Sequence, residues 1–219
     1  MTGSVTRLVA DAVLFDSDGV LVDSHDRVVV AWSTLAAEVG LDYAALEMQF
    51  VGVPAHETLG RHLPGERLAA AVARLEDLEV DTADGTAPIA GAHELLASLP
   101  PDRWTIVTSA SRRLGEARWR GAGLPVPARS ITADDVERGK PDPAPFLAGA
   151  AMLGFEPARC VVFEDSPSGG VAAVAAGTTV VAVGGLTWRV EPAARIGDLR
   201  DVAVETLADG SLSLTLRTV

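Results

Sequence analysis

The fold of this chain is constrained most by its short, continuously apolar runs, which are AVLF (12–15), WTIV (104–107), CVVF (160–163) and TVVAV (179–183), with a weaker run, RSIT, at 129–132. Strands that helices cover on both faces have unbroken apolar runs, whereas half-exposed strands alternate. Helical patterns lie between these runs, at 111–122, 143–153 and 167–176. This alternation of strand and helix predicts an α/β fold with a parallel sheet and helices on both sides.

One interval between the first two strands is much longer than a crossover requires. Apolar spacing predicts several helices in it, at 26–40, 43–50, 57–63 and 66–80, followed by a return helix at 91–99. The borders of the interval carry the Asp, Gly and Pro residues that are typical of hinges. We therefore expect two domains: an α/β core formed by residues 1–23 and 87–219, and an all-helical insertion at 24–86.

Charge and composition exclude several classes of function. The 219 residues carry a formal net charge of −12, which argues against a nucleic-acid or anionic-membrane partner. No apolar stretch approaches the length of a membrane span, and the N-terminus lacks the pattern of a signal peptide. The single cysteine, Cys160, fits a reducing compartment. We expect a cytoplasmic monomer that acts on a small molecule.

Acidic and polar residues follow the predicted strands at one edge of the sheet. Asp16 and Asp18 come after the first strand, Ser109 and Ala110 after the second, and Glu164 and Asp165 after CVVF; the weaker run leads to Lys140. The carboxyl ends of parallel strands form the ligand-binding edge in open sheets. Several carboxylates at one place repel each other unless a cation lies among them, and hard oxygen ligands favour Mg²⁺. The sequence therefore predicts a Mg²⁺ site there.

Two further residues fit a phosphate ligand beside that metal. Lys140 offers a compact positive charge, and Ser109 stands where a strand leads into a helix, with backbone N–H groups nearby. Gly19 allows a tight turn directly after the two aspartates.

Four segments taken in order, FDSDGVLVDS, VTSAS, GKPDP and VVFEDSPSG, resemble the four motifs of the haloacid dehalogenase superfamily of phosphohydrolases. The predicted helical insertion resembles that superfamily's helical cap, and the segment from 103 to 143 is similar to its sugar-phosphate and glycerol-phosphate phosphatases. The resemblance leaves out the tail after about residue 200. It implies a Rossmann-like core with a cap domain, and a Mg²⁺-dependent phosphatase acting on a small sugar or polyol phosphate.

The resemblance also implies a role for each site residue. Asp16 would be the nucleophile that forms an aspartyl-phosphate, and Asp18 the general acid and base. Ser109, Ala110 and Lys140 would bind the phosphate. Asp16, the backbone carbonyl of Asp18, and Asp165 would hold Mg²⁺, with Glu164 as a further ligand or as a hydrogen-bond acceptor behind them.

Two other functions remain open. A β-phosphoglucomutase shares the motifs, but it uses a cap histidine near the position of Val28 and a basic cap residue near Ala55, and the segment FVGVPAHETLG has no Arg or Lys before Arg61. A non-catalytic binding module could keep the fold, although the intact set of acids argues against it. Both considerations favour the phosphatase.

Overall fold

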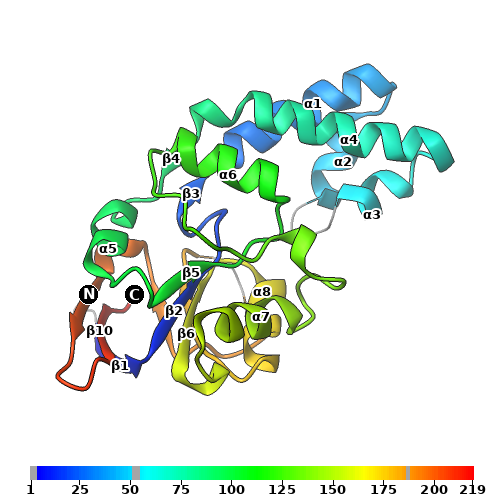
Figure 1. The fold of residues 1–219 in the computed structure, drawn as a ribbon. Helices are drawn as coiled ribbons and strands as arrows, with labels where there is room; N and C mark the ends of the chain where they lie inside the picture. Colours follow the sequence, from blue (N-terminus) through cyan, green and yellow to red (C-terminus); the bar gives the residue numbers. More distant parts are fainter. Residues whose placement is uncertain (1–3, 51–54, 186–187) are drawn as a thin grey trace.

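A parallel sheet of five strands lies at the centre of the α/β part of the protein. The computed structural model describes residues 4–50, 55–185 and 188–219 (Figure 1). The strand order is β5 (Trp104–Ile106), β2 (Ala12–Phe15), β6 (Cys160–Glu164), β7 (Thr179–Val183) and β8 (Ala194–Ile196). Each of the four strong apolar runs forms one of these strands, as predicted. The weaker run at 129–132 contributes only an isolated bridge, between Ile131 and Val107, because it holds a single large apolar residue.

Helices cover both faces of this sheet, as the continuous apolar runs predict. Those in the α/β part are α5 (Ala92–Ser98), α6 (Arg112–Gly121), α7 (Ala144–Leu153) and α8 (Pro167–Ala175). Strand β2 contributes Val13 and Phe15 to one buried apolar cluster and Leu14 to another. Side chains alternate between the two faces of a strand, so each face of the sheet has its own core.

A separate group of helices lies between two short strands, β3 (Val22–Asp23) and β4 (Ala87–Pro88), which pair antiparallel. We call this group the helical insertion; its members are α1 (His25–Val39), α2 (Tyr43–Phe50), α3 (Ala55–Gly60) and α4 (Gly65–Asp81). It has its own apolar cluster, which includes Trp32, Leu35 and Leu75. The strand pair brackets residues 24–86, the interval predicted from the sequence. Residues 51–54 of FVGVPAHETLG lie outside the described residues.

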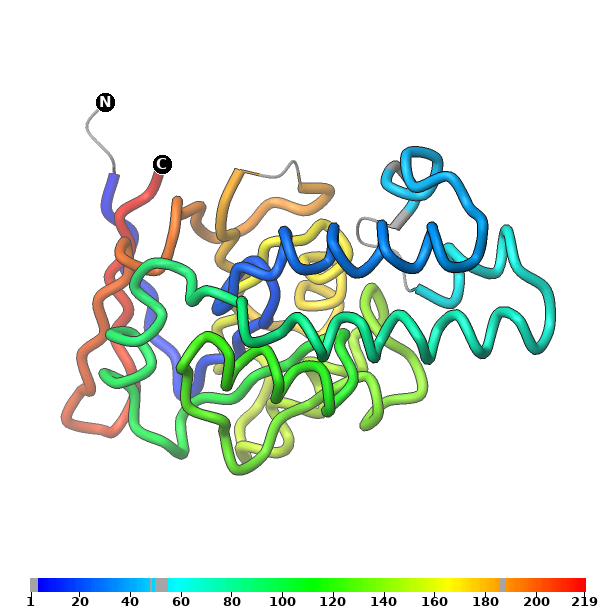
Figure 2. Tube along the Cα trace, turned by 90° about the horizontal axis from the view of Figure 1, so that it is seen from above, coloured from blue at the N-terminus to red at the C-terminus, as the bar shows by residue number. Residues whose placement is uncertain are grey.

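The two ends of the chain form an antiparallel sheet that the sequence analysis does not predict. Its order is β1 (Val5–Ala10), β10 (Leu212–Arg217) and β9 (Val202–Thr206). Figure 2 shows the two chain ends side by side, with the helical insertion at the opposite end of the molecule. Leu212, Leu214 and Leu216 are fully buried in the same core as β2. The tail therefore belongs to the folded core, although it lies outside the resemblance.

Among the described residues, no helix is both long and apolar enough to cross a membrane.

Candidate active site

Three carboxylates meet at the carboxyl ends of β2 and β6. Asp16 directly follows β2, and its backbone N–H donates to the carbonyl oxygen of Phe163 at 2.9 Å, which continues the pairing of the two strands. Glu164 is the last residue of β6, and Asp165 follows it. One carboxylate oxygen from each of Asp16, Glu164 and Asp165 lies within 4.8 Å of the others. The predicted convergence of these acids is therefore present in the fold.

Lys140 lies between two of these carboxylates. Its Nζ donates to Asp16 Oδ1 at 2.5 Å and to Glu164 Oε2 at 2.8 Å, and only 4% of its side chain is exposed. The other oxygen of Glu164 accepts hydrogen bonds from the backbone N–H of Ser166 at 3.0 Å and from its hydroxyl at 2.8 Å. Both oxygens of Glu164 are thus engaged, which favours its role as the acceptor that orients Lys140.

The electrostatics of this acid cluster favour a bound cation. Burial, reinforced by the charge of Glu164 and opposed by Lys140, raises the pKa of Asp16 to about 7. Burial and the charges of Asp16 and Glu164 raise the pKa of Asp165 to about 8. Burial alone would lower the pKa of Lys140, but the two adjacent carboxylates raise it above its ordinary value.

The donor set fits a small divalent metal ion. Three carboxylates face one ammonium group, which leaves two uncompensated negative charges when all are ionised. The turn at Gly19 closes the cluster on one side: its φ is +79°, and a Cβ there would lie 2.1 Å from Asp165 Oδ2. Only glycine permits this backbone to approach the carboxylate so closely.

Asp18 lies beside the acid cluster and is anchored separately. Its Oδ1 accepts hydrogen bonds from Ser24 Oγ at 2.6 Å and from Arg118 Nη1 at 2.9 Å. Its side chain is not among the three carboxylates of the cluster. Asp16 and Asp18 therefore differ in environment, because Asp16 contacts a lysine and Asp18 contacts an arginine and a hydroxyl.

Ser109 and Ala110 lie in the loop that leads from β5 to α6. This loop begins at the sheet edge that carries Asp16, because Val107 N donates to the carbonyl oxygen of Phe15 at 2.8 Å. Ser109 is exposed, and the N–H of Ala110 donates to Thr108 Oγ1 at 3.1 Å. Ser111 caps α6 by accepting from the N–H of Leu114 at 3.2 Å. The loop that carries Ser109 therefore begins beside the strand that leads to Asp16.

The structure adds site residues that the sequence analysis does not identify: Ser24, Glu79, Arg118 and Ser166. Ser24 and Ser166 form local hydrogen bonds with predicted motif acids, which short sequence segments rarely reveal. Arg118 is one of several arginines on α6, and no sequence pattern distinguishes it from its more exposed neighbours. Glu79 comes from α4, far away in the sequence.

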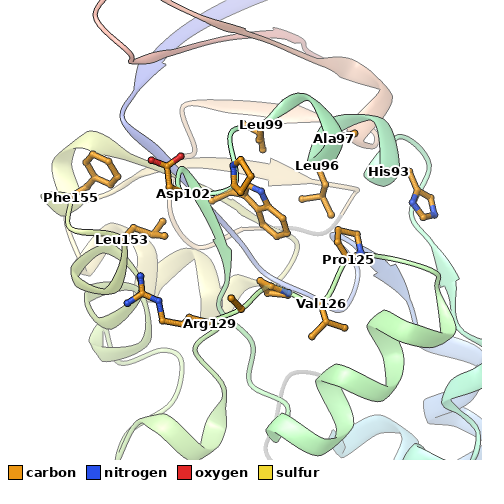
Figure 3. A pocket seen from close by; sticks show the side chains of 14 residues that line it. His93, Leu96, Ala97, Leu99, Asp102, Pro125, Val126, Arg129, Leu153 and Phe155 are labelled. Atoms are coloured by element: carbon orange, nitrogen blue, oxygen red, sulfur yellow. The ribbon is translucent and has the colours of Figure 1, made fainter.

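A cleft of about 810 Å³ lies away from these acids. Figure 3 shows His93, Leu96 and Leu99 from α5 and the turn after it on one side of the cleft, with Leu153 and Phe155 on another. Trp104, which lines it, is the first residue of β5, so the cleft is at the amino end of the strand. None of the predicted site residues lines it.

Known proteins resemble this chain in sequence and in fold. The sequence model of the haloacid dehalogenase-like hydrolase family matches residues 10–177. Hexitol phosphatase A of Escherichia coli is 41% identical over 175 residues, covering 78% of this chain and 81% of that protein. Glycerol-1-phosphate phosphohydrolase 2 of Saccharomyces cerevisiae is 28% identical, covering 84% of this chain and 78% of that protein. A hydrolase structure from Pseudomonas syringae has a TM-score of 0.69 at 26% identity, covering 80% and 84% of the two chains.

This chain belongs to the haloacid dehalogenase-like hydrolases. The family match contains both the acids after β2 and those after β6, together with the helical insertion between β3 and β4. The family and the fold class that the motifs indicate are thereby confirmed.

Proposed function

We propose that this protein is a Mg²⁺-dependent phosphatase that hydrolyses a small sugar or polyol phosphate monoester, of the glycerol phosphate, hexitol phosphate or deoxyhexose phosphate type. The observation that carries the proposal is the buried cluster of Asp16, Glu164 and Asp165 around Lys140, with Asp18 anchored beside it. The names of the relatives support the class of substrate. The helical insertion would act as the cap over the site.

The first chemical step forms a covalent intermediate. A carboxylate oxygen of Asp16 attacks phosphorus, and the bond from phosphorus to the ester oxygen breaks. Asp18 gives its proton to that leaving oxygen, so an alcohol departs instead of an alkoxide. Lys140 and Ser109 bind phosphoryl oxygens. Mg²⁺, held by Asp16, Asp165 and the backbone carbonyl of Asp18, would neutralise phosphoryl charge when it is bound.

The second step returns the enzyme to its starting state. Asp18, now ionised, takes a proton from water, and the water oxygen attacks phosphorus. The bond from phosphorus to the Asp16 oxygen breaks, which releases inorganic phosphate and restores the Asp16 carboxylate. Proton and phosphoryl transfer therefore balance over one cycle without an additional reactant.

A panel of phosphate esters assayed with Mg²⁺ tests this function. Glycerol phosphate, hexitol phosphates and 2-deoxyglucose 6-phosphate should release inorganic phosphate, with kcat/KM identifying the best substrate. ³¹P NMR of β-glucose 1-phosphate with a catalytic amount of sugar bisphosphate tests the mutase. Accumulation of glucose 6-phosphate without inorganic phosphate would contradict the phosphatase, and no turnover of any ester would favour a binding module.

A further inference from the structure

One buried guanidinium connects the helical insertion to Asp18. Arg118 of α6 has only 6% of its side chain exposed, and its Nη1 donates to Asp18 Oδ1 at 2.9 Å. Its Nη2 donates to Glu79 Oε1 of α4 at 3.1 Å, and 14% of the Glu79 side chain is exposed. A buried arginine is costly unless acids pair with it, and here each of its two acids comes from a different part of the fold. The orientation of Asp18 is thus linked to the position of α4.

Two further contacts, made by Trp119 and Gly121, hold the C-terminal end of α6 in place near Arg118. Trp119 Nε1 donates to Ser17 Oγ at 2.8 Å, and Ser17 lies between the two site aspartates. Gly121 packs directly on the 3-10 helix η1 (Ala83–Gly85), because a Cβ on Gly121 would lie 2.1 Å from the carbonyl oxygen of Ala83. Helix α6 therefore contacts both the loop that holds Asp16 and Asp18 and the segment that follows α4. Figure 1 shows α6 next to α4.

The hydrogen bonds of Asp18 are distributed unequally over its two oxygens. Oδ1 accepts from both Ser24 and Arg118, whereas no described residue donates to Oδ2. Anchoring one oxygen fixes the carboxylate plane and leaves the other oxygen able to carry the proton that the leaving group needs. Loss of Arg118 or of its partner Glu79 would allow the carboxylate to rotate.

We propose that Arg118 and Glu79 are positioning residues for Asp18, which hold its carboxylate in the orientation for protonating the leaving alcohol while α4 packs on α6. The inference rests on the proposed phosphatase function. It extends that function by giving the contact between α4 and α6 a direct effect on proton transfer.

Two esters with different leaving groups test the inference. An alkyl phosphate needs a proton on its leaving oxygen, whereas p-nitrophenolate leaves from p-nitrophenyl phosphate without one. The ratio of kcat/KM for the best alkyl phosphate of the panel to that for p-nitrophenyl phosphate isolates proton donation, because kcat/KM covers only the steps up to the first product. Asp18→Asn provides the reference for complete loss of the proton donor.

We expect Glu79→Gln and Arg118→Lys to lower this ratio by about 10-fold or more, a part of the ~10²–10⁴ that general acid catalysis contributes. Arg113→Gln is the matched control. Arg113 is on the same helix and pairs with Asp77 of α4 at 2.6 Å, but it is exposed. Its ratio should equal that of the wild type.

Each outcome decides one of the two proposals. Equal losses of kcat/KM for both esters in Glu79→Gln and Arg118→Lys would leave the ratio unchanged. That result would indicate a purely structural contact and would overturn the inference, as would wild-type values of kcat/KM for both esters. If Arg118→Lys does not fold, Glu79→Gln decides alone, because it keeps the shape of the side chain. A wild-type protein that releases phosphate from no ester would instead overturn the proposed function.

Discussion

Lys140 determines how the carboxylates of the acid cluster can coexist in a buried place. It contacts Asp16 and Glu164 directly, while Asp165 has a raised pKa because it is buried beside both of them. Glu164 uses both oxygens in hydrogen bonds to Lys140 and Ser166, which supports the proposal that Asp16, and not Glu164, is the nucleophile. Replacing one carboxylate oxygen of Asp16 by an amide nitrogen tests this role.

Asp16→Asn should lower kcat by at least ~10³-fold, because a carboxamide cannot act as the nucleophile. The fold should be retained, since the amide is almost the same size and Lys140 keeps Glu164 as its partner. The measurement is the rate of phosphate release, with a circular dichroism spectrum of the variant. Asp23→Asn, an exposed acid outside the cluster, should keep normal activity. Near-normal turnover of Asp16→Asn would contradict the aspartyl-phosphate.

Gly19→Ala tests the close approach of the backbone to Asp165. Gly40→Ala is the control, because Gly40 has a similar φ of +75° but no atom within 4 Å of where a Cβ would lie, whereas a Cβ on Gly19 would meet Asp165 Oδ2. Both variants should lose about 1–2 kcal/mol of unfolding free energy from the left-handed backbone. Only Gly19→Ala should also lose activity, because Asp165 must move. Equal activity of the two variants would show that the contact has no catalytic importance.

At the scale of secondary structure, the antiparallel sheet β1-β10-β9 packs against one face of the parallel sheet. The buried leucines of β10 share a cluster with Val13 and Phe15 of β2. The C-terminal strand β10 therefore helps to cover β2, the strand that leads to Asp16.

Leu214→Ala should lower the unfolding free energy by about 2–5 kcal/mol, as expected for a buried leucine whose cavity is not refilled. Leu147→Ala makes the same chemical change at a site that is 42% exposed, and should cost less than about 1 kcal/mol. Urea unfolding followed by fluorescence measures both. Equal midpoints for the two variants would show that β10 does not contribute to the core.

At the scale of the whole molecule, the acid cluster adds closely spaced carboxylates to a chain that is already strongly acidic. The chain has a net charge of −12, and in the acid cluster Asp16 and Glu164 are buried beside the half-buried Asp165. Burial keeps water from screening their repulsion, so a bound divalent ion would stabilise the entire fold.

Addition of Mg²⁺ should raise the melting temperature of the wild-type protein. At 100 times the dissociation constant the gain is about 2.7 kcal/mol for a ligand that binds only the native state. Asp165→Asn should lose most of this shift, whereas Asp23→Asn should keep it. Phosphate release should cease in excess chelator and return with Mg²⁺. Full turnover in chelator, or a melting temperature unaffected by millimolar Mg²⁺, would contradict the metal assignment.

Local patterns in the sequence are sufficient for the parallel sheet and for the acids at its edge. Runs such as CVVF form buried strands because β-branched residues favour extended backbone and neither face needs polar residues. Parallel pairing then brings the carboxyl ends of all these strands to one edge, and Asp16 and Asp165 meet there because β2 and β6 are neighbours in the sheet. The predicted limits of the helical insertion rest on the length of the helical interval and on the Asp, Gly and Pro residues at its borders.

The tertiary structure alone decides which of several similar residues becomes buried and paired. Arg112, Arg113, Arg118 and Arg120 are all on α6, and only Arg118 is buried, because α4 and the loop of Asp18 both pack over that position. Likewise, the alternation in LSLTLR is compatible with any half-buried strand, and its pairing with β1 joins residues about two hundred positions apart. The sequence by itself therefore determined four of the five strands of the parallel sheet, the helices that follow them and the edge where the acids gather. Their partners were decided by packing between distant segments, whose contacts depend on positions that no local pattern records.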